Sequence, residues 1–307
     1  MKSLIIILSF FSIISIQTAL ALEADNTLNI GGAKIEVYFD PGVAEQDYNV
    51  NREQVMEWID RSAIAVTKYF QRFPVKTLRM KITDGATRRR INGTAYHGDE
   101  PLIIINLHKS FNNNTLARDW VMVHEMVHLS FPPVKRRHHW LLEGLATYVE
   151  PIVRVRDGLL LEDKAWEWLV KGTPQGLPEA GNQGLDNTPT WGQRYWGGAI
   201  FFLIADMRIH QQTNNKFGIE HSLRAIQRGG GSMQLENDWE VVKALSMGDK
   251  ATGTNVLVDL YNEMRDKSVM TDLDAIWKEL GVNLNGNTIS YNDTAKYADL
   301  RRSIYMK

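Results

Sequence analysis

The chain has 307 residues, of which 44% are hydrophobic and 23% are charged, and its formal net charge is -1. This composition is that of a globular protein with enough apolar residues for a substantial core. The near-neutral charge gives no long-range attraction to nucleic acid or to an anionic membrane, so we expect neither as a partner. The basic triplets 88–90 and 135–137 are interpreted as solvated loop charges.

The N-terminus has the residue order of a secretory signal peptide. Lys2 precedes an apolar stretch from Leu4 to Ile16, and the small residues Ala19 and Ala21 follow. We therefore expect an exported chain that is cleaved after Ala21 and has no stable insertion in a membrane after removal of the signal. An uncleaved membrane anchor is the alternative, but the apolar run is short and no strong cationic stop follows it.

The chain contains no cysteine. An exported protein without disulfides fits a bacterial protein that is periplasmic or secreted better than a eukaryotic extracellular one. Any metal site in this chain must then be built from His, Asp and Glu.

The first part of the mature chain, residues 22–114, predicts a sheet with one packed helix. Apolar runs bounded by turn residues predict strands at 28–30, 34–39, 78–82 and 102–107, the last of them buried on both faces. Apolar residues at helical spacing between the second and third strands predict a helix that Asn51 caps and Pro74 stops.

The second part, residues 115–307, predicts an almost entirely helical lobe. The expected helices cover residues 115–130, 139–150, 162–171, 193–211, 219–228, 238–246, 255–266 and 272–280, with Thr115 capping the first and Pro151 ending the second. Residues 173–187 lack periodicity and predict a long loop. Because strands and helices are segregated along the chain, the fold class is α+β, with a mixed or mostly antiparallel sheet.

The helix expected at 115–130 carries the sequence His124-Glu125-Met126-Val127-His128. Residues four apart lie one turn above each other on the same face of a helix, so His124 and His128 can direct both imidazoles at one metal ion. This spacing fits zinc. Glu125 flanks the ion and can reach a water molecule without binding the metal, which is the place of a general base.

Two histidines and a water leave tetrahedral zinc one protein ligand short. Glu143 lies on the next predicted helix, beyond Pro132 and Pro133, which break the first helix and let the second return against it. We expect it to be the third ligand. His139 is the alternative because it precedes Glu143 by four residues, although it is better interpreted as the start of the helix or a residue that supports the ligands.

The segments HEMVH and WLLEGLATYVE (residues 140–150) together resemble the gluzincin zinc metallopeptidases of the MA type, with their thermolysin-like catalytic domain, and most of all the aminopeptidase N family. The resemblance implies one zinc ion bound by His124, His128 and Glu143. It also implies that Glu150 supports the metal site from outside the ligand set. The spacer between the two helices is shorter here than in those aminopeptidases.

A third segment, residues 195–199, is similar to the tyrosine segment of the same family. By this resemblance Tyr195 donates a hydrogen bond to the oxyanion, a role that suits a phenol because it is a neutral donor at pH 7. Residues 93–97 occupy the place of the family's G-x-M-E-N motif but have no glutamate to bind a substrate's amino group. Asp99 and Glu100 are interpreted as turn residues, so we expect a peptidase but not an aminopeptidase.

The sequence thus predicts an exported zinc metallopeptidase with Glu125 as general base and a peptide or protein as substrate. A zinc-binding scaffold or binding protein that has lost turnover is the alternative from another class. A metal-free helical protein with a chance motif is a third interpretation.

Overall fold

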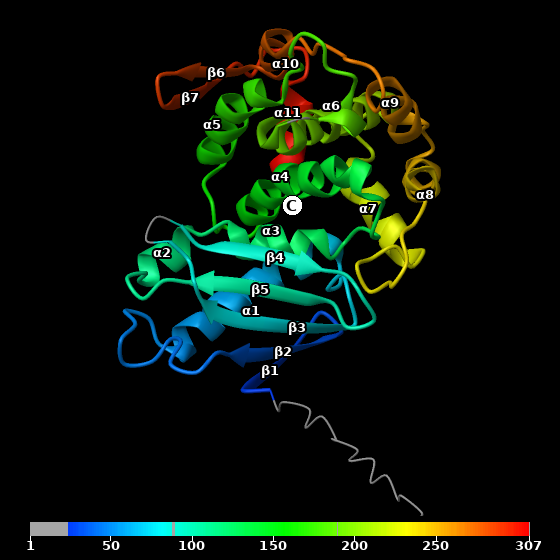
Figure 1. The fold of residues 1–307 in the computed structure, drawn as a ribbon. Helices are drawn as coiled ribbons and strands as arrows, with labels where there is room; N and C mark the ends of the chain where they lie inside the picture. The colour runs from blue at the N-terminus through cyan, green and yellow to red at the C-terminus, as the bar shows by residue number, and fades with distance from the viewer. Residues whose placement is uncertain (1–23, 88–89, 189, 307) are drawn as a thin grey trace, which may run out of the picture.

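The computed structural model of the protein describes residues 24–87, 90–188 and 190–306 (Figure 1). The expected signal peptide and its cleavage site lie outside these residues. Among the helices of the described ranges, none combines the length and the apolar character needed to cross a membrane.

The N-terminal part of the chain forms one five-stranded sheet with the strand order β1-β2-β3-β5-β4. The strands are β1 (Asn26–Ile30), β2 (Ala33–Phe39), β3 (Thr77–Asp84), β4 (Asn92–Tyr96) and β5 (Leu102–Leu107). The edge strands β1 and β4 pair antiparallel with their neighbours, whereas β2, β3 and β5 run parallel.

The sheet is therefore mixed, as one form of the expectation states, and it is not mostly antiparallel. The physical reason is the connection through the helix α1 (Arg52–Phe70), which carries the chain back across the sheet so that β3 starts beside the start of β2. Figure 1 shows α1 behind the strands. In β5, buried and partly buried residues alternate, so this strand is not buried on both faces as predicted.

The predicted N-cap of α1 is confirmed. The Asn51 side chain accepts a hydrogen bond from the Gln54 backbone N–H at 2.9 Å, and the Gln54 side chain accepts one from the Asn51 N–H at 2.8 Å. The helix ends at Phe70, four residues before Pro74, because Gln71 adopts the left-handed conformation with φ of 65°.

The rest of the chain is mainly helical. Its helices are α2 (Asn113–Arg118), α3 (Val121–His128), α4 (His139–Arg156), α5 (Glu162–Gly172), α6 (Gly198–Gln212), α7 (Ile219–Arg228), α8 (Val241–Thr252), α9 (Val256–Met264), α10 (Leu273–Leu280) and α11 (Ala298–Tyr305). Together with the N-terminal sheet they form a mixed α/β architecture. Figure 1 shows α3 and then α4 following the sheet at the centre of the molecule, with the later helices beyond them.

Several helix boundaries differ from the predictions. The helix α8 runs to Thr252 rather than to residue 246, and α6 begins at Gly198 rather than at residue 193. The helix expected over 115–130 is two helices, because the chain turns at Asp119, whose carboxylate accepts the Met122 N–H at 2.9 Å at the start of α3. Asn112, not Thr115, caps the first of them. Pro151 does not end α4, since buried residues on both sides of it continue the helix to Arg156.

A hairpin near the C-terminus was not predicted. It consists of β6 (Val282–Asn285) and β7 (Thr288–Tyr291), joined through Gly286 with φ of 62°. The Asn-Gly pair at 285–286 is the hairpin signal in this stretch. The last helix, α11, was also not predicted, and its buried Leu300 and Ile304 pack it into the helical lobe.

Candidate metal centre

The two histidines of α3 point into the interior of the molecule. Every residue of α3 is buried, because the helix packs against α1, α4 and β4. His124 and His128 lie one turn apart with ring centroids 4.8 Å from each other and the rings nearly perpendicular. The i,i+4 spacing therefore brings two imidazoles to one point, as the sequence predicts.

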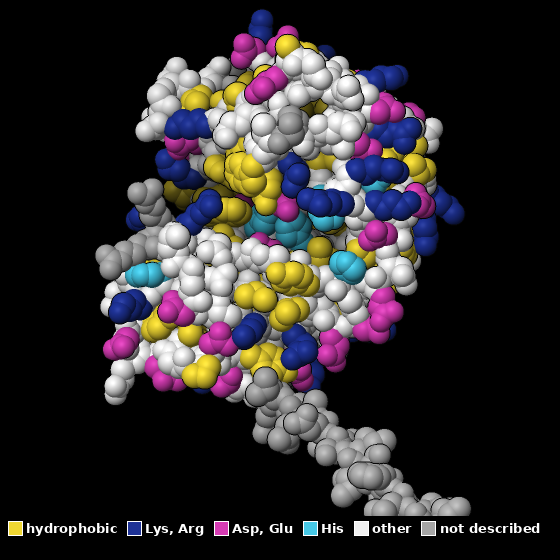
Figure 2. All heavy atoms as spheres, in the orientation of Figure 1, with side chains coloured by type: hydrophobic (Ala, Val, Ile, Leu, Met, Phe, Trp, Pro, Cys, Tyr) yellow, Lys and Arg dark blue, Asp and Glu magenta, His cyan; other side chains and the backbone are white. Residues whose placement is uncertain are grey.

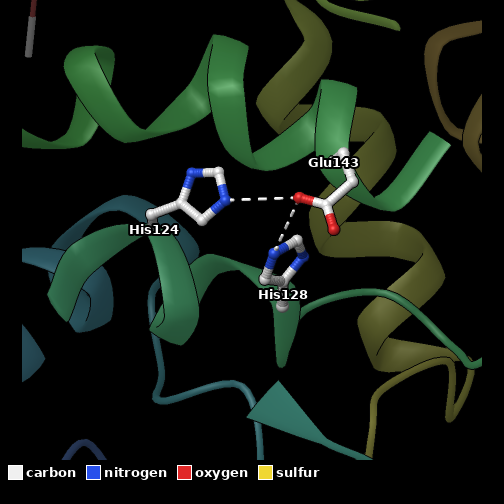
Figure 3. Close-up of side chains that lie close together, drawn as sticks. All are labelled: His124, His128 and Glu143. Atoms are coloured by element: carbon white, nitrogen blue, oxygen red, sulfur yellow. Dashed lines mark ion pairs between the residues drawn. The ribbon is translucent and has the colours of Figure 1, made fainter. Parts of the chain in front are cut away.

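Glu143 reaches the same point from α4. Its Oε2 lies 3.5 Å from His124 Nε2 and 3.6 Å from His128 Nε2, and Figure 3 shows the three side chains pointing toward one another from the two helices. One donor atom of each residue lies within 4.8 Å of the other two. His139 does not belong to this group. It is exposed and is the first residue of α4, which agrees with its interpretation as the start of the helix.

These distances fit a bound metal better than hydrogen bonds. Ligand atoms about 2.1 Å from a tetrahedral zinc ion lie roughly 3.4 Å from each other, whereas a distance of 3.6 Å is too long for a hydrogen bond. The Glu143 Oε2 atom is buried and has no hydrogen-bond partner among the described residues. The donor set of two imidazoles and one carboxylate is also one that zinc accepts.

The charges at this point favour the ligand forms of His124 and Glu143. Burial would lower the pKa of His128, but the adjacent Glu143 carboxylate outweighs it and raises that pKa. Burial lowers the pKa of His124 to about 4, which keeps its imidazole neutral. Burial alone would raise the pKa of Glu143, but the two adjacent imidazoles outweigh it and hold that pKa well below its usual range. A metal ion requires this combination of neutral imidazole and ionised carboxylate.

Glu125 lies beside this group without belonging to it. Its side chain is buried against β4, where Gly93 makes room for it: a Cβ on Gly93 would lie 2.7 Å from Glu125 Cγ. The pKa of Glu125 is raised to about 7, mainly by burial; the charge of His128 opposes the rise and the charge of Glu143 adds to it. Glu125 thus faces the cleft with a carboxyl group whose proton affinity is increased.

Tyr195 approaches from the other side, on a single π-helical turn at Gln193–Gly197 that leads into α6. Its ring is parallel to that of His124, with centroids 6.0 Å apart and planes 5° from parallel. Burial and the negative charge of Glu143 raise the pKa of its hydroxyl, so the phenol stays protonated and can donate.

The turn that carries Tyr195 is fixed by contacts between backbones. Gly144 of α4 and Gly198 of α6 touch so closely that a Cβ on either residue would overlap the other's backbone. Behind the turn, the indole of Trp196 occupies the space that a Cβ on Gly172 would fill. α4 and α6 therefore hold Glu143 and Tyr195 at a fixed separation.

A cleft opens on the His128 side of the group. Figure 2 shows it as a hollow with histidines at its centre, between the sheet below and the helical lobe above. The cleft is lined by residues 93–97 in and after β4, by Arg136 and His139 at or just before the start of α4, by Met233 and Asp238 in loops, and by Glu125, His128, Glu143 and Tyr195. Sequence reasoning missed Arg136 and Asp238 as cleft residues, because residues outside the long helices and strands carry no periodic signal.

Neither Asp99 nor Glu100 lines this cleft. Glu150 does not support the metal group as the resemblance implied. It is buried and receives a hydrogen bond from Arg154 at 2.8 Å, while the Nδ1 atoms of His124 and His128 have no partner among the described residues. Arg154 also donates to the carbonyl of Arg118, so the pair joins α4 to the end of α2.

The fold is similar to solved zinc metallopeptidases. An aminopeptidase N family protein from Idiomarina loihiensis matches with a TM-score of 0.58 and 12% identity, over 84% of this chain and 49% of that one. The M1 zinc metallopeptidase from Deinococcus radiodurans matches with a TM-score of 0.51 and 12% identity, over 81% and 52%. A mutant of the latter enzyme bound to a Tyr-Ser-Ala substrate has a TM-score of 0.53 at 11% identity.

The chain thus has the fold of M1 zinc metallopeptidase domains and carries a three-residue group able to bind a metal. It spans about half the length of the structures that it matches. No protein-family model matches the sequence, and no curated protein matches it either.

Proposed function

We propose that this protein is an exported zinc-dependent metallopeptidase that hydrolyses peptide bonds. The observation that carries the proposal is the convergence of His124, His128 and Glu143, with Glu125 and Tyr195 facing the same cleft. The peptidase fold and the Tyr-Ser-Ala substrate bound by one similar structure support a peptide substrate. Export is supported by the N-terminal sequence alone.

His124, His128 and Glu143 would hold one zinc ion. When bound, zinc supplies Lewis acidity, which polarises a carbonyl and lowers the pKa of water. Glu125 takes the proton of the attacking water and passes it to the leaving amine. Tyr195 donates a hydrogen bond from its hydroxyl to the carbonyl oxygen as negative charge develops there.

The peptide backbone has a binding surface in β4. This strand lies at the edge of the sheet and lines the cleft, so its outer backbone groups are free to pair with an extended peptide. Main-chain pairing of this kind accepts many sequences. The absence of an amine-binding glutamate at 93–97 favours action away from the amino terminus of the substrate.

A zinc-binding scaffold without turnover is the competing function. Glu125 separates the two, because a purely structural site has no use for a buried carboxyl group beside the ligands, and structural zinc is usually closed by four protein ligands. The described residues bring together three.

The test is the substitution Glu125→Gln, which keeps the shape of the side chain and removes its basicity. We expect this variant to bind one zinc ion per chain, to unfold at the wild-type temperature and to lose peptide hydrolysis by at least about 100-fold. Hydrolysis is measured on a broad peptide library by mass spectrometry. Undiminished cleavage by the variant would falsify the role of Glu125, and a wild-type protein that binds zinc but cleaves nothing would favour the scaffold.

A further inference from the structure

Three aromatic side chains that line the cleft or contact residues of the site are exposed to solvent. Tyr96, Trp120 and Trp191 expose 49%, 37% and 57% of their surface, and they are three of the seven exposed large hydrophobic side chains among the described residues. They come from β4, from the junction of α2 and α3, and from the turn before Tyr195. Segments far apart in the sequence therefore place exposed aromatic rings beside residues of the site.

Each of these rings lies next to the site, either in contact with one of its residues or in the lining of the cleft. Trp120 makes an edge contact with His124 at 5.1 Å between ring centroids, and Tyr96 lines the cleft. Trp191 stacks on Tyr195, with centroids 4.4 Å apart and planes 28° from parallel. Trp191 is thus the most exposed of the three and stands directly against the proposed oxyanion donor.

The position of Trp191 is set by the rigid turn that follows it. The close packing of Trp196 on Gly172 and of Gly176 on the Gly197 backbone holds this turn from behind. Trp191 therefore does not need to reorganise when it meets a ligand, and a preformed aromatic surface loses little entropy on binding. Exposed tryptophans with such support are typical of binding sites.

We infer that Trp191 forms a subsite that accepts an aromatic or large apolar side chain of the peptide next to the cleaved bond. The inference rests on the proposed function. A ring docked there would bury apolar surface on Trp191 and stack on it, which smaller side chains cannot do. The subsite would thus add side-chain selectivity to the backbone pairing at β4.

The experiment uses two pairs of octapeptides that are built from glycine and serine and blocked at both ends. The two peptides of a pair differ only in carrying phenylalanine or alanine beside the central bond. This residue lies on the amino side of the bond in the first pair and on its carboxyl side in the second. The wild-type protein should cleave the phenylalanine peptide of one pair about tenfold more efficiently in kcat/KM. Trp191→Ala should abolish this ratio mainly by raising KM for the phenylalanine peptide, while Trp191→Phe should retain most of it. Leu161→Ala is the control, since Leu161 is 74% exposed and precedes α5, none of whose residues line the cleft, whereas Trp191 stacks on the cleft residue Tyr195.

An unchanged ratio in Trp191→Ala overturns the inference. So does an equal fall of kcat for both peptides of a pair, because Trp191 would then only position Tyr195. If the wild-type protein cleaves no peptide, the proposed function fails while the subsite is still decided by calorimetry of the two peptides on the zinc-loaded protein. Tenfold tighter binding of the phenylalanine peptide that is lost in Trp191→Ala supports it, and equal binding overturns it.

Discussion

The substitution Gly144→Ala tests whether the contact between α4 and α6 supports the site. Gly144 lies inside a helix, where alanine in place of glycine normally stabilises by about 1 kcal/mol. In this protein a Cβ at position 144 would lie 2.7 Å from the carbonyl oxygen of Gly198, and still closer to its carbonyl carbon and Cα. Ordinary contact begins at 3.4 Å and the nearest atom, the Gly198 carbonyl carbon, would lie at 2.2 Å, so one helix must move by about 1.2 Å.

The obstacle is backbone, which cannot rotate away as a side chain would. Overpacking of this kind costs up to about 3 kcal/mol, which leaves a net loss of about 2 kcal/mol after the helical gain. We therefore expect the melting temperature to fall by about 4–8 °C. Activity should fall as well, because α4 carries Glu143 and α6 directly follows the turn that carries Tyr195.

Differential scanning calorimetry of Gly144→Ala beside Gly192→Ala measures this effect. Gly192 also has helical dihedral angles, and its added Cβ would meet nothing nearer than the Gln175 carbonyl oxygen at 3.1 Å. The control should melt within about 2 °C of the wild type, since its small intrinsic gain offsets a slight crowding. A Gly144→Ala protein that melts at or above the wild-type temperature refutes the reasoning about the helix contact.

Two further predictions concern metal and pH. Removal of metal with a chelator should lower the melting temperature. Zinc at about 100 times its dissociation constant should then raise the free energy of unfolding by about 2.7 kcal/mol. His128→Ala should show no such response, and a wild-type protein that does not respond contradicts the ligand assignment. Burial raises the pKa of Glu150 to about 7 in spite of Arg154, so the folded state retains a proton that the unfolded state loses above its ordinary pKa of 4.5. The free energy of unfolding should therefore decline as pH rises from 5 to 8. In urea unfolding, Glu150→Gln should reduce that decline by about 2 kcal/mol. Equal declines in the variant and the wild type would contradict the raised pKa of Glu150.

The chemistry of the site could be predicted from sequence because its signals are local. The spacing of His124 and His128 needs only the geometry of one helix, and Glu143 needs only a helix that returns. The structure brings all three together. The aromatic residues beside the site were not predicted. Trp120 and Trp191 lie four residues before His124 and Tyr195 and contact them, but each alone is typical of a core residue.

The fold could be predicted in its helices and less well in its sheet. Strand direction depends on which strands become neighbours, and the parallel pairs of β3 with β2 and β5 link residues far apart in the chain. Pro151 misled for a related reason: local chemistry favours ending the helix there, but burial of Ile152 and Val153 continues it. Glu150 was misplaced because its role was inferred from the resemblance, and here Arg154 lies one turn away and takes the carboxylate.

The three proposed ligands lie within twenty consecutive residues, from 124 to 143. Closing so short a loop costs little chain entropy, so metal capture requires only α3, α4 and the bend between them. Tyr195 and Trp191 reach the site only when α6, which follows them, packs against α4, and this contact forms across a much longer span of chain. During folding, metal acquisition can therefore come before catalytic competence, and a protein arrested between the two stages would bind its ion yet be unable to use it.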